Sequence, residues 1–309
     1  MKKSVAMATY NGAEYIVEQL ESIRTQTMAV DEVIICDDCS KDDTVAVVQK
    51  YIEEHDLTDT WKIEVNEKNL GYASNFIGAA MKTTGDLIFF CDQDDVWVPD
   101  RIKVMTELME KNEKIQLLCS EFESFVSTAD APSVPTWEQK AFKRDNSLEH
   151  LPFIPHNVFI NCQGCSMCIR GSFWNEIKGE WYTGWAHDEF VWKMALCKDG
   201  LYVYHGVTLR RRLHTNNVTM HKMRDLPKRI KFMEDLKKSH EATLAFARKI
   251  GLGEKEIKLL ERNVVSAQMR VELMRDKKIW KMVPLALFYY DCYHSPKSIL
   301  VEPYMAIKG

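Results

Sequence analysis

The chain has 309 residues, of which 46% are hydrophobic and 28% are charged, with a formal net charge of −4. This composition is typical of a globular protein with a full hydrophobic core, and its slightly acidic balance disfavours a nucleic acid as the partner. Nine cysteines, an odd number in a chain of this length, do not resemble the disulfide framework of a small secreted domain. We find no signal peptide behind Met1 and no run of about 18 apolar residues. We therefore expect a cytoplasmic protein, at most peripheral to the inner face of the plasma membrane.

Short apolar runs alternate with amphipathic segments over the first 111 residues. Apolar runs predict strands, and apolar residues spaced by three and four predict helices. The predicted strands are 5–9, 32–36, 61–65 and 86–91, and the predicted helices are 13–26, 44–55, 75–81 and 100–111. This alternation predicts an α/β fold with helices on both faces of a sheet, and ligands of such sheets bind beyond the carboxyl ends of the strands.

The second half of the chain has a different pattern. A strand is predicted near 116–120, an irregular stretch over 127–145 and mixed α/β structure over 161–213. Two long helical patterns follow over 227–276, separated by Gly251-Leu252-Gly253. We therefore expect one domain over 1–222 and a C-terminal helical appendage over 223–309.

The run Asp92-Gln93-Asp94-Asp95 directly follows the most apolar of the predicted strands. Carboxylates beside a buried strand are costly unless something compensates their charge. Mg²⁺ and Mn²⁺ prefer oxygen ligands and are often held by one or two carboxylates together with substrate phosphates. A metal there would neutralise the charge on a departing diphosphate. An acidic turn that caps the next helix explains the same residues, so the run alone leaves both interpretations open.

Polar clusters also follow the other three strands of this half. They are Ala8-Thr9-Tyr10-Asn11-Gly12, then Asp37-Asp38-Cys39-Ser40-Lys41-Asp42-Asp43-Thr44, and then Asn69-Leu70-Gly71 with Asn75. Together with an Asp-X-Asp element formed by Asp92 and Asp94, their order and spacing resemble the family 2 glycosyltransferases with the GT-A fold. The resemblance implies a Rossmann-like mixed sheet flanked by helices, with a nucleotide-sugar-binding half over 1–115 and an acceptor half over 116–222.

The resemblance also implies which side chains bind the nucleotide-sugar donor. They are Thr9, Tyr10, Asn11, Glu14, Asp37, Asp38, Asn69, Asn75, Asp92, Gln93 and Arg212. The ring of Tyr10 can stack on a pyrimidine, and the Asp37 carboxylate can accept hydrogen bonds from base or ribose. Ordinary packing at a strand end is the alternative for Tyr10. Arg212 can bind phosphate oxygens in a bidentate manner, or it can face solvent from a strand.

The same resemblance implies a site for Mn²⁺ or Mg²⁺ formed by Asp94, Asp92 and His214. The segment His214-Thr215-Asn216-Asn217 resembles the position of a late histidine in bacterial polysaccharide rhamnosyltransferase-like members, where it reaches the metal or the phosphates. A purely structural histidine explains His214 equally well.

Two later segments resemble the acceptor side of the family. They are Asn161-Cys162-Gln163-Gly164-Cys165-Ser166-Met167 and Trp185-Ala186-His187-Asp188-Glu189-Phe190. The resemblance places the catalytic base at Asp188, a carboxylate that would take a proton from an acceptor hydroxyl. Glu189 is the nearest competitor for this role, and capping of the following helix is the structural alternative for Asp188.

We therefore expect an inverting, metal-dependent hexosyltransferase. Its donor would be dTDP-rhamnose or a UDP-hexose, and its acceptor a bacterial surface glycan or a lipid-linked oligosaccharide. A sugar nucleotidyltransferase is an alternative, but it would need a Gly- and Arg-rich phosphate loop after the first strand. A non-catalytic protein that binds nucleotide sugars or glycans is a second alternative, and it would need no base.

The C-terminal third predicts an interaction surface. Residues 222–250 hold nine basic and four acidic residues, and an aromatic-rich apolar segment follows over 279–290. A basic helix beside such a segment can lie on an anionic membrane leaflet. Contact with a second subunit in a homodimer, or packing against the first domain, explains the same residues equally well.

Overall fold

The computed structural model describes residues 1–128, 130–135, 138, 141–215 and 225–308. The chain divides into two compact units, one of residues 1–151 and 162–217 and the other of residues 152–161 and 218–309. The expected boundary between 222 and 223 lies outside the described residues. The sequence pattern placed 152–161 in the first domain, but this segment packs within the second unit. There η1 (Pro155–Val158) contacts η6 (Tyr290–Cys292), and the ring of Phe159 meets His240 edge-on at 5.7 Å.

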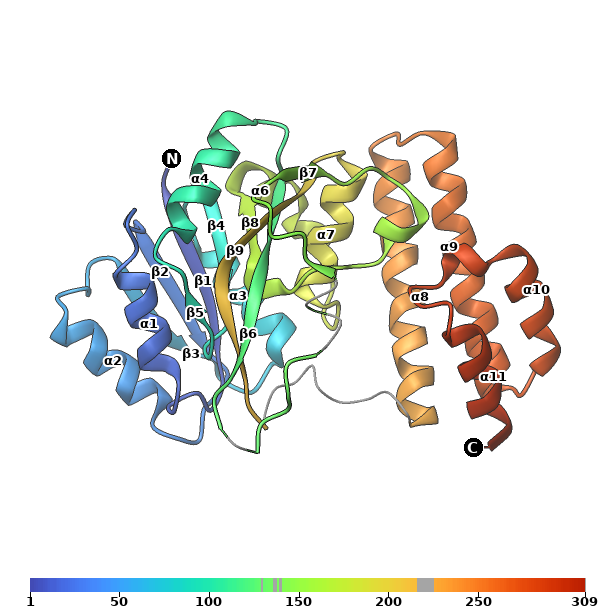
Figure 1. Cartoon of the computed structure of the whole chain (residues 1–309), viewed down its shortest axis with the longest axis horizontal. Coiled ribbons are helices and arrows are strands. Elements are labelled where there is room, and N and C mark those ends of the chain that lie inside the picture. Colours follow the sequence, from blue (N-terminus) through green and yellow to red (C-terminus); the bar gives the residue numbers. More distant parts are fainter. Residues whose placement is uncertain (129, 136–137, 139–140, 216–224, 309) are drawn as a thin grey trace. The chain divides into compact units, whose positions relative to one another are not determined.

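The first unit is built on one mixed sheet, in which the described residues form nine strands (Figure 1). The strand order is β3-β2-β1-β4-β8-β6-β9-β5, with β7 also paired to β9. Strands β1 to β4 run parallel, and β8 is antiparallel between β4 and β6. The bounds are β1 Lys3–Thr9, β2 Glu32–Asp37, β3 Trp61–Val65, β4 Leu87–Cys91, β5 Val96–Trp97, β6 Leu117–Val126, β7 Leu148–His150, β8 Met167–Arg170 and β9 Leu201–Leu213.

Helices cover both faces of this sheet, as the sequence predicted. Successive strand residues point to opposite faces. Val5 and Met7 of β1 therefore join one buried cluster with residues of α1, α2 and α4, while Phe90 of β4 meets Phe76 of α3 on the other side, with ring centroids 6.2 Å apart. The bounds are α1 Ile16–Arg24, α2 Thr44–Glu54, α3 Tyr72–Lys82, α4 Arg101–Lys111, α6 Gly171–Ile177 and α7 His187–Cys197, with η2 Gly164–Ser166 and η3 Lys178–Glu180.

Three element boundaries differ from the sequence predictions for tertiary reasons. The strand expected at 116–120 continues to Val126, because β6 pairs in parallel with β9 over its whole length. Val96 and Trp97 form a strand because β9 supplies an antiparallel partner. The helix expected from Asn75 begins at Tyr72, directly after Gly71, whose φ of +80° suits glycine.

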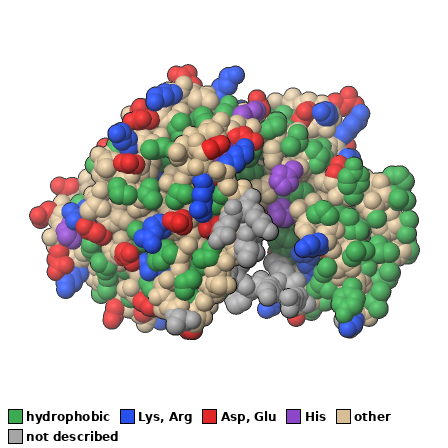
Figure 2. Space-filling view, viewed as in Figure 1, with side chains coloured by type: hydrophobic (Ala, Val, Ile, Leu, Met, Phe, Trp, Pro, Cys, Tyr) green, Lys and Arg blue, Asp and Glu red, His purple; other side chains and the backbone are tan. Residues whose placement is uncertain are grey.

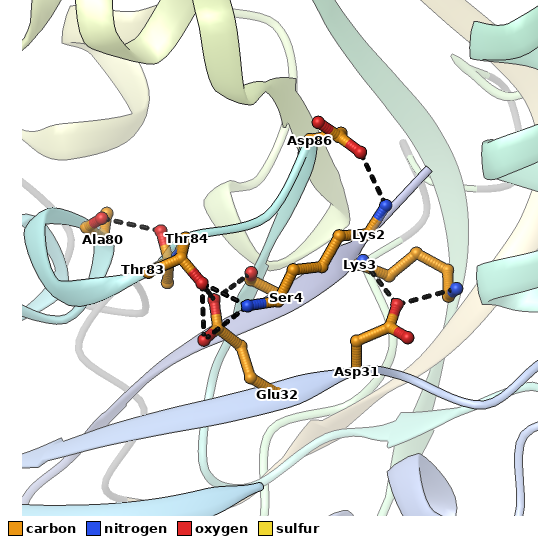
Figure 3. Close-up of polar contacts among 9 residues, drawn as sticks. All are labelled: Lys2, Lys3, Ser4, Asp31, Glu32, Ala80, Thr83, Thr84 and Asp86. Atoms are coloured by element: carbon orange, nitrogen blue, oxygen red, sulfur yellow. Dashed lines mark hydrogen bonds and ion pairs between the residues drawn. The ribbon is translucent and has the colours of Figure 1, made fainter.

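A ladder of ion pairs and hydrogen bonds closes the amino-terminal edge of the sheet (Figure 3). Asp31 accepts hydrogen bonds from the backbone N–H and the ammonium group of Lys3, at 2.7 and 2.8 Å. Glu32 accepts hydrogen bonds from the hydroxyls of Ser4 and Thr84 and from the Thr84 N–H. A surface depression beside this edge is lined mainly by such charged side chains. The carboxylates here are thus satisfied by neighbouring donors.

The second unit is helical, with two long helices where the periodicity of 227–276 predicted them. The Asp225 side chain caps the first of these helices by accepting a hydrogen bond from the N–H of Lys228 at 2.9 Å. Its buried core includes Met233, Met274 and Leu285. None of the described helices has the length and hydropathy needed to cross a membrane. The bounds are α8 Leu226–Lys249, α9 Glu254–Arg275, η5 Ile279–Lys281, α10 Met282–Phe288 and α11 Ser298–Lys308.

Candidate active site

The loops after β1, β2 and β4 meet at one edge of the sheet. Because these strands are parallel and adjacent, their carboxyl ends lie side by side: Thr9 pairs with Asp37, and Met7 with Cys91. The Thr9 hydroxyl donates a hydrogen bond to the Asp37 carboxylate at 2.8 Å. The polar clusters that are separate in the sequence therefore gather at the edge where open α/β sheets bind ligands.

Asp37 and Asp38 hold the loops of this edge in place. Both are buried, at 0% and 2% exposure. Asp37 accepts hydrogen bonds from the N–H and hydroxyl of Ser40 at 2.8 and 2.5 Å. Asp38 accepts hydrogen bonds from the N–H groups of Leu70 and Gly71 at 2.6 and 2.8 Å. Each carboxylate is thus occupied by protein donors, and direct contact with the donor molecule stays a prediction for both.

Asn75 lies beneath the same edge and is 2% exposed. Its amide nitrogen donates to the carbonyl oxygens of Cys36 and Thr9 at 2.7 and 3.3 Å, and its amide oxygen accepts from Asn66 at 2.9 Å. Asn75 therefore ties the ends of β1 and β2 together. All of its polar atoms have protein partners, which is the arrangement of a positioning residue.

Four of the predicted donor-binding side chains form an exposed rim. Tyr10 is 46% exposed, and its backbone exchanges two hydrogen bonds with the amide of Gln93 at 2.8 and 3.0 Å. Gly12 leaves room for this amide, because a Cβ at position 12 would lie 2.3 Å from the Gln93 oxygen. The rim residues are Tyr10, Asn11, Glu14 and Asn69.

The acidic run after β4 lies between the rim and η2. Asp92, Asp95 and Cys165 each offer one candidate ligand atom, and these three atoms lie within 4.8 Å of one another. Burial, followed by repulsion from Asp95 and Asp94, raises the pKa of Asp92 well above its ordinary value. Burial and the charge of Asp94 also raise the pKa of Asp95. No described N–H or O–H group donates to the buried Oδ2 of Asp95. Burying these carboxylates without a partner costs free energy, and a divalent cation such as Mg²⁺ or Mn²⁺, which prefers oxygen ligands, would compensate their charge.

His214 and Arg212 reach this run from the end of β9. The Nε2 atom of His214 lies 2.7 Å from Oδ2 of Asp94. Of the three predicted metal ligands, Asp94 and His214 therefore contact each other. The third, Asp92, lies close to Asp95, which was not a predicted ligand. Arg212 donates from its backbone N–H to Asp95 at 3.0 Å and from its Nε to the Asp94 carbonyl oxygen at 2.9 Å. Asn216 and Asn217 lie outside the described residues.

The guanidinium group of Arg212 has partners within the protein. It forms an ion pair with Glu18, and it lies 4.7 Å from the ring centroids of both Tyr15 and Phe125. Arg212 is 6% exposed, whereas Arg210 beside it on β9 is exposed. Arg212 therefore fixes the backbone of the acidic run, and direct contact with a diphosphate stays a prediction.

Asp188 lies in the first turn of α7, and Ala186 is the residue that precedes the helix. Burial raises the pKa of Asp188 from 3.8 to about 6. A Cβ on Gly164 would lie 3.3 Å from the Asp188 Cβ and 2.6 Å from the His187 ring, so this glycine lets α7 approach η2 closely. The next residue, Cys165, lies against Asp92 and Asp95. The turn η2 therefore connects the acidic cluster with Asp188.

The neighbours of Asp188 have other roles. Glu189 forms an ion pair at 2.7 Å with Lys193, whose side chain is 1% exposed. The ring of His187 stacks on Phe76 at 4.0 Å, and burial lowers its pKa to about 3, so the ring is neutral. Because Glu189 balances a buried ammonium group, Asp188 is the better candidate for a base.

The sequence reasoning missed three residues of this site. Asp95 was visible in the acidic run but was not assigned as a ligand. Cys165 joins the cluster through the turn η2, and Glu18 pairs with Arg212 from the first turn of α1. Only the repeated acidic residue gave a signal in the sequence, because the other two contacts depend on tertiary packing.

Comparisons with known proteins agree with this geometry. The profile of glycosyl transferase family 2 matches residues 4–176. The protein named UDP-Glc:alpha-D-GlcNAc-diphosphoundecaprenol beta-1,3-glucosyltransferase WfgD, from Escherichia coli, is 30% identical over 109 residues, which are 35% of this chain and 41% of WfgD. The chain thus spans less than half the length of WfgD and of other curated relatives that it matches.

Solved structures show the same fold. The structure of Staphylococcus aureus TarS residues 1–349 with UDP-GlcNAc superposes with a TM-score of 0.68 at 15% identity, covering 99% of this chain and 90% of that chain. The mannosyltransferase PcManGT from Pyrobaculum calidifontis, with GDP-Man and Mn²⁺, gives a TM-score of 0.54 at 15% identity, covering 99% and 86%. The expected mixed α/β fold is confirmed, and with more than half of its residues matched, the chain belongs to glycosyl transferase family 2.

Proposed function

We propose that this chain transfers a hexose, with inversion, from a nucleoside-diphosphate donor to a carbohydrate acceptor. The observation that carries the proposal is the position of η2 between two acidic sites. On one side, Asp92 and Asp95 have raised pKa values and suit a cation, and on the other, Asp188 has a raised pKa that suits a base. A leaving diphosphate and an attacking hydroxyl need these two functions close together.

The exposed rim binds the nucleotide in this proposal. Tyr10 offers an aromatic face to the base, held in place by the Gln93 amide, and Asn11, Glu14 and Asn69 offer polar groups to base and ribose. The buried residues Thr9, Asp37, Asp38 and Asn75 support these loops from below. Arg212 acts in the same way, because its guanidinium and N–H hold the acidic run.

Asp94, Asp92 and His214 would hold Mn²⁺ or Mg²⁺ at the acidic run. The cation supplies neutralisation of the charge that develops on the diphosphate. Asp95, with its unpartnered oxygen, adds negative charge behind them. The neighbour PcManGT was solved with GDP-Man and Mn²⁺, which supports a metal in a fold of this kind.

Asp188 takes the proton of the attacking hydroxyl. Its raised pKa of about 6 leaves it ionised at neutral pH and makes it a stronger proton acceptor than an ordinary aspartate. The carboxylate keeps its orientation at the start of α7 through a hydrogen bond from the Glu189 N–H at 2.8 Å. The inverting outcome is inferred from the family resemblance alone.

A UDP-hexose is the donor that we place first. The similar protein WfgD is named for the donor UDP-Glc, and the structure of TarS was solved with UDP-GlcNAc bound. Support for dTDP-rhamnose comes only from the sequence around His214. WfgD is also named for a diphosphoundecaprenol acceptor. This favours a lipid-linked oligosaccharide over a soluble sugar as the acceptor of this chain. A cytoplasmic location stays a prediction from the sequence.

Release of nucleoside diphosphate tests this function. We would incubate the full chain with UDP-Glc, UDP-Gal, UDP-GlcNAc, GDP-Man and dTDP-rhamnose, in Mn²⁺, in Mg²⁺ and in EDTA. We expect release from one donor, dependent on metal and lost in Asp94→Asn. The matched control is Glu32→Gln at the opposite edge of the sheet, which should release diphosphate at the wild-type rate.

The same assay separates the alternatives. A sugar nucleotidyltransferase would instead form nucleoside triphosphate and sugar phosphate when pyrophosphate is added. A binding protein would retain donor in equilibrium dialysis without any turnover. Metal-independent release, or equal release by Asp94→Asn, would contradict the proposed role of the acidic run.

A further inference from the structure

The second unit presents a large apolar surface that its core does not use. Nine large hydrophobic side chains from η5, α10, η6 and α11 are each at least 48% exposed. Figure 2 shows hydrophobic side chains gathered over the C-terminal helices. We name this set the C-terminal apolar surface; its members are Trp280, Val283, Leu287, Phe288, Tyr290, Leu300, Val301, Tyr304 and Ile307.

The helical spacing places the exposed apolar residues of α11 on one face of the helix. On α11, Leu300, Tyr304 and Ile307 recur at spacings of four and three and are 73%, 57% and 70% exposed. The opposite face of the same helix carries Glu302 and Ala306, which are fully buried. The exposed side of α11 is therefore apolar, whereas its buried side carries the ion-paired Glu302. Several large apolar side chains exposed on one helix face indicate an interaction site.

The charges around the C-terminal apolar surface are basic. Residues 277–308, all described, hold five lysines and two carboxylates, and two of the lysines, Lys278 and Lys281, pair with Glu272 of α9 at 2.9 and 2.6 Å. The carboxylates are Asp291, which pairs with Arg262 at 2.7 Å, and Glu302, which pairs with Arg229 and Arg270 at 2.6 Å each. Both carboxylates are thus neutralised by arginines of α8 and α9.

Lysines stand beside the exposed aromatic rings. The ammonium of the exposed Lys308 lies 4.9 Å from the ring centroid of Tyr304. That of Lys281 lies 5.5 Å from the ring centroid of Trp280, but the Lys281 side chain is 12% exposed and pairs with Glu272. Tryptophan and tyrosine prefer the level of lipid headgroups, where lysine side chains reach the phosphates. Protein interface cores, by contrast, are depleted in lysine. The combination therefore favours an anionic lipid surface over a second copy of this chain.

The long basic helix that the sequence suggested for this role is less suited to it. On α8, Lys231 pairs with Asp235 at 2.6 Å and Lys237 with Glu241 at 3.3 Å. Because Lys278 and Lys281 are also ion-paired, the two regions differ mainly in their exposed apolar groups. Phe232 is the one large hydrophobic residue of α8 with substantial exposure among the described residues, at 40%. The apolar surface thus lies on α10 and α11, in a segment that follows the basic helix.

We propose that the C-terminal apolar surface binds a bilayer rich in anionic phospholipid, with α10 and α11 lying in the plane of the headgroups. Apolar side chains enter the acyl boundary, and the exposed Lys297 and Lys308 contact lipid phosphates. This binding does not depend on the proposed transfer chemistry.

Vesicle sedimentation of the full chain tests this binding. We would compare phosphatidylcholine vesicles with vesicles that also contain phosphatidylglycerol, at low and high salt. We expect sedimentation with the anionic vesicles, weakened by salt. The variants Trp280→Ser/Leu287→Ser and Tyr304→Ser/Ile307→Ser should each lower the partition coefficient by about tenfold or more, because two exposed apolar groups are removed.

The matched control is Val265→Ser on α9, 43% exposed in the same unit but outside the C-terminal apolar surface. It should bind vesicles as the wild type does. Loss of binding in this control, or failure of the wild type to sediment with anionic vesicles, would overturn the proposal. So would a stable dimer, seen by light scattering, that the double variants break while vesicle binding is absent. Diphosphate release by the double variants should stay at the wild-type rate, which separates this test from that of the transfer reaction.

Discussion

Two pairs of carboxylates at opposite edges of the same sheet, Asp31 with Glu32 and Asp92 with Asp188, have pKa values shifted in opposite directions. At the amino-terminal edge, partial burial disfavours the charged forms of Asp31 and Glu32, but hydrogen bonds from Lys3, Ser4 and Thr84 outweigh it and lower both pKa values. At the carboxyl-terminal edge, burial raises the pKa values of Asp92 and Asp188, and no comparable donors offset it.

The difference separates a structural use of charge from a functional one. Carboxylates at the amino-terminal edge are stabilised by the fold and join strands together. At the other edge, where protein donors satisfy Asp37 and Asp38, Asp92 and Asp188 are kept at a cost in stability. That is the condition expected where a ligand or a proton completes the site. The comparison predicts that substitutions at the two edges have opposite effects on activity and stability.

The largest expected effect is on transfer by Asp188→Asn. We expect the rate to fall by about 10²- to 10⁴-fold, because the amide cannot accept the proton of the acceptor hydroxyl. The measurement is incorporation of labelled sugar into a bacterial membrane lipid extract. Donor binding by equilibrium dialysis should be unchanged.

The matched variant Glu189→Gln should give the reverse pattern. It leaves the buried Lys193 without its partner, so we expect a lower melting temperature with most of the transfer activity retained. If Glu189→Gln abolished transfer and Asp188→Asn did not, the roles of these two residues would have to be exchanged.

The second effect is on pH dependence. Because the pKa of Asp188 is about 6, its active ionised form is lost as pH falls through that value. We expect kcat/KM for sugar transfer to the acceptor to rise about tenfold for each pH unit below 6 and to level off above it. The residual activity of Asp188→Asn should lack this step. A profile that levels off near pH 4 would contradict a raised pKa at Asp188.

The smallest effect is on stability at the amino-terminal edge. Glu32→Gln removes the charge that Ser4 and Thr84 bind, and we expect a loss of about 1 kcal/mol at neutral pH. A group with a lowered folded pKa contributes stability above its unfolded value of 4.5, and this contribution is lost as pH falls. The difference between wild type and variant in urea unfolding should therefore shrink toward pH 3. A constant difference would show that packing, and not charge, is lost.

The sequence predicted the fold best where the signal was local. Strands and helices up to Lys111 follow from periodicity, and the polar clusters after the strands predicted which edge carries the site. Contacts between distant segments could not be predicted in this way. The ion pair of Glu18 with Arg212 joins residues that are 194 positions apart, and the cluster of Asp95 with Cys165 depends on the turn η2.

The C-terminal region shows the same limit. The apolar run over 279–290 was visible in the sequence, but the sequence analysis assigned no role to Leu300, Tyr304 and Ile307. Their exposure follows from Glu302, which turns the opposite face of α11 inward to meet Arg229 and Arg270. Only the tertiary structure therefore shows which face of α11 is free to bind a surface.

The most direct test of the account is the thermal stabilisation by UDP and Mn²⁺ of the wild type, Asp94→Asn and Glu32→Gln. A ligand present at 100 times its Kd stabilises the folded state by about 2.7 kcal/mol. We predict a clear rise in Tm for the wild type and an equal rise for Glu32→Gln from its lower starting Tm, whereas Asp94→Asn should lose most of the rise. An equal rise in Asp94→Asn, or none in the wild type, would contradict a donor and metal site at the carboxyl-terminal edge of the sheet.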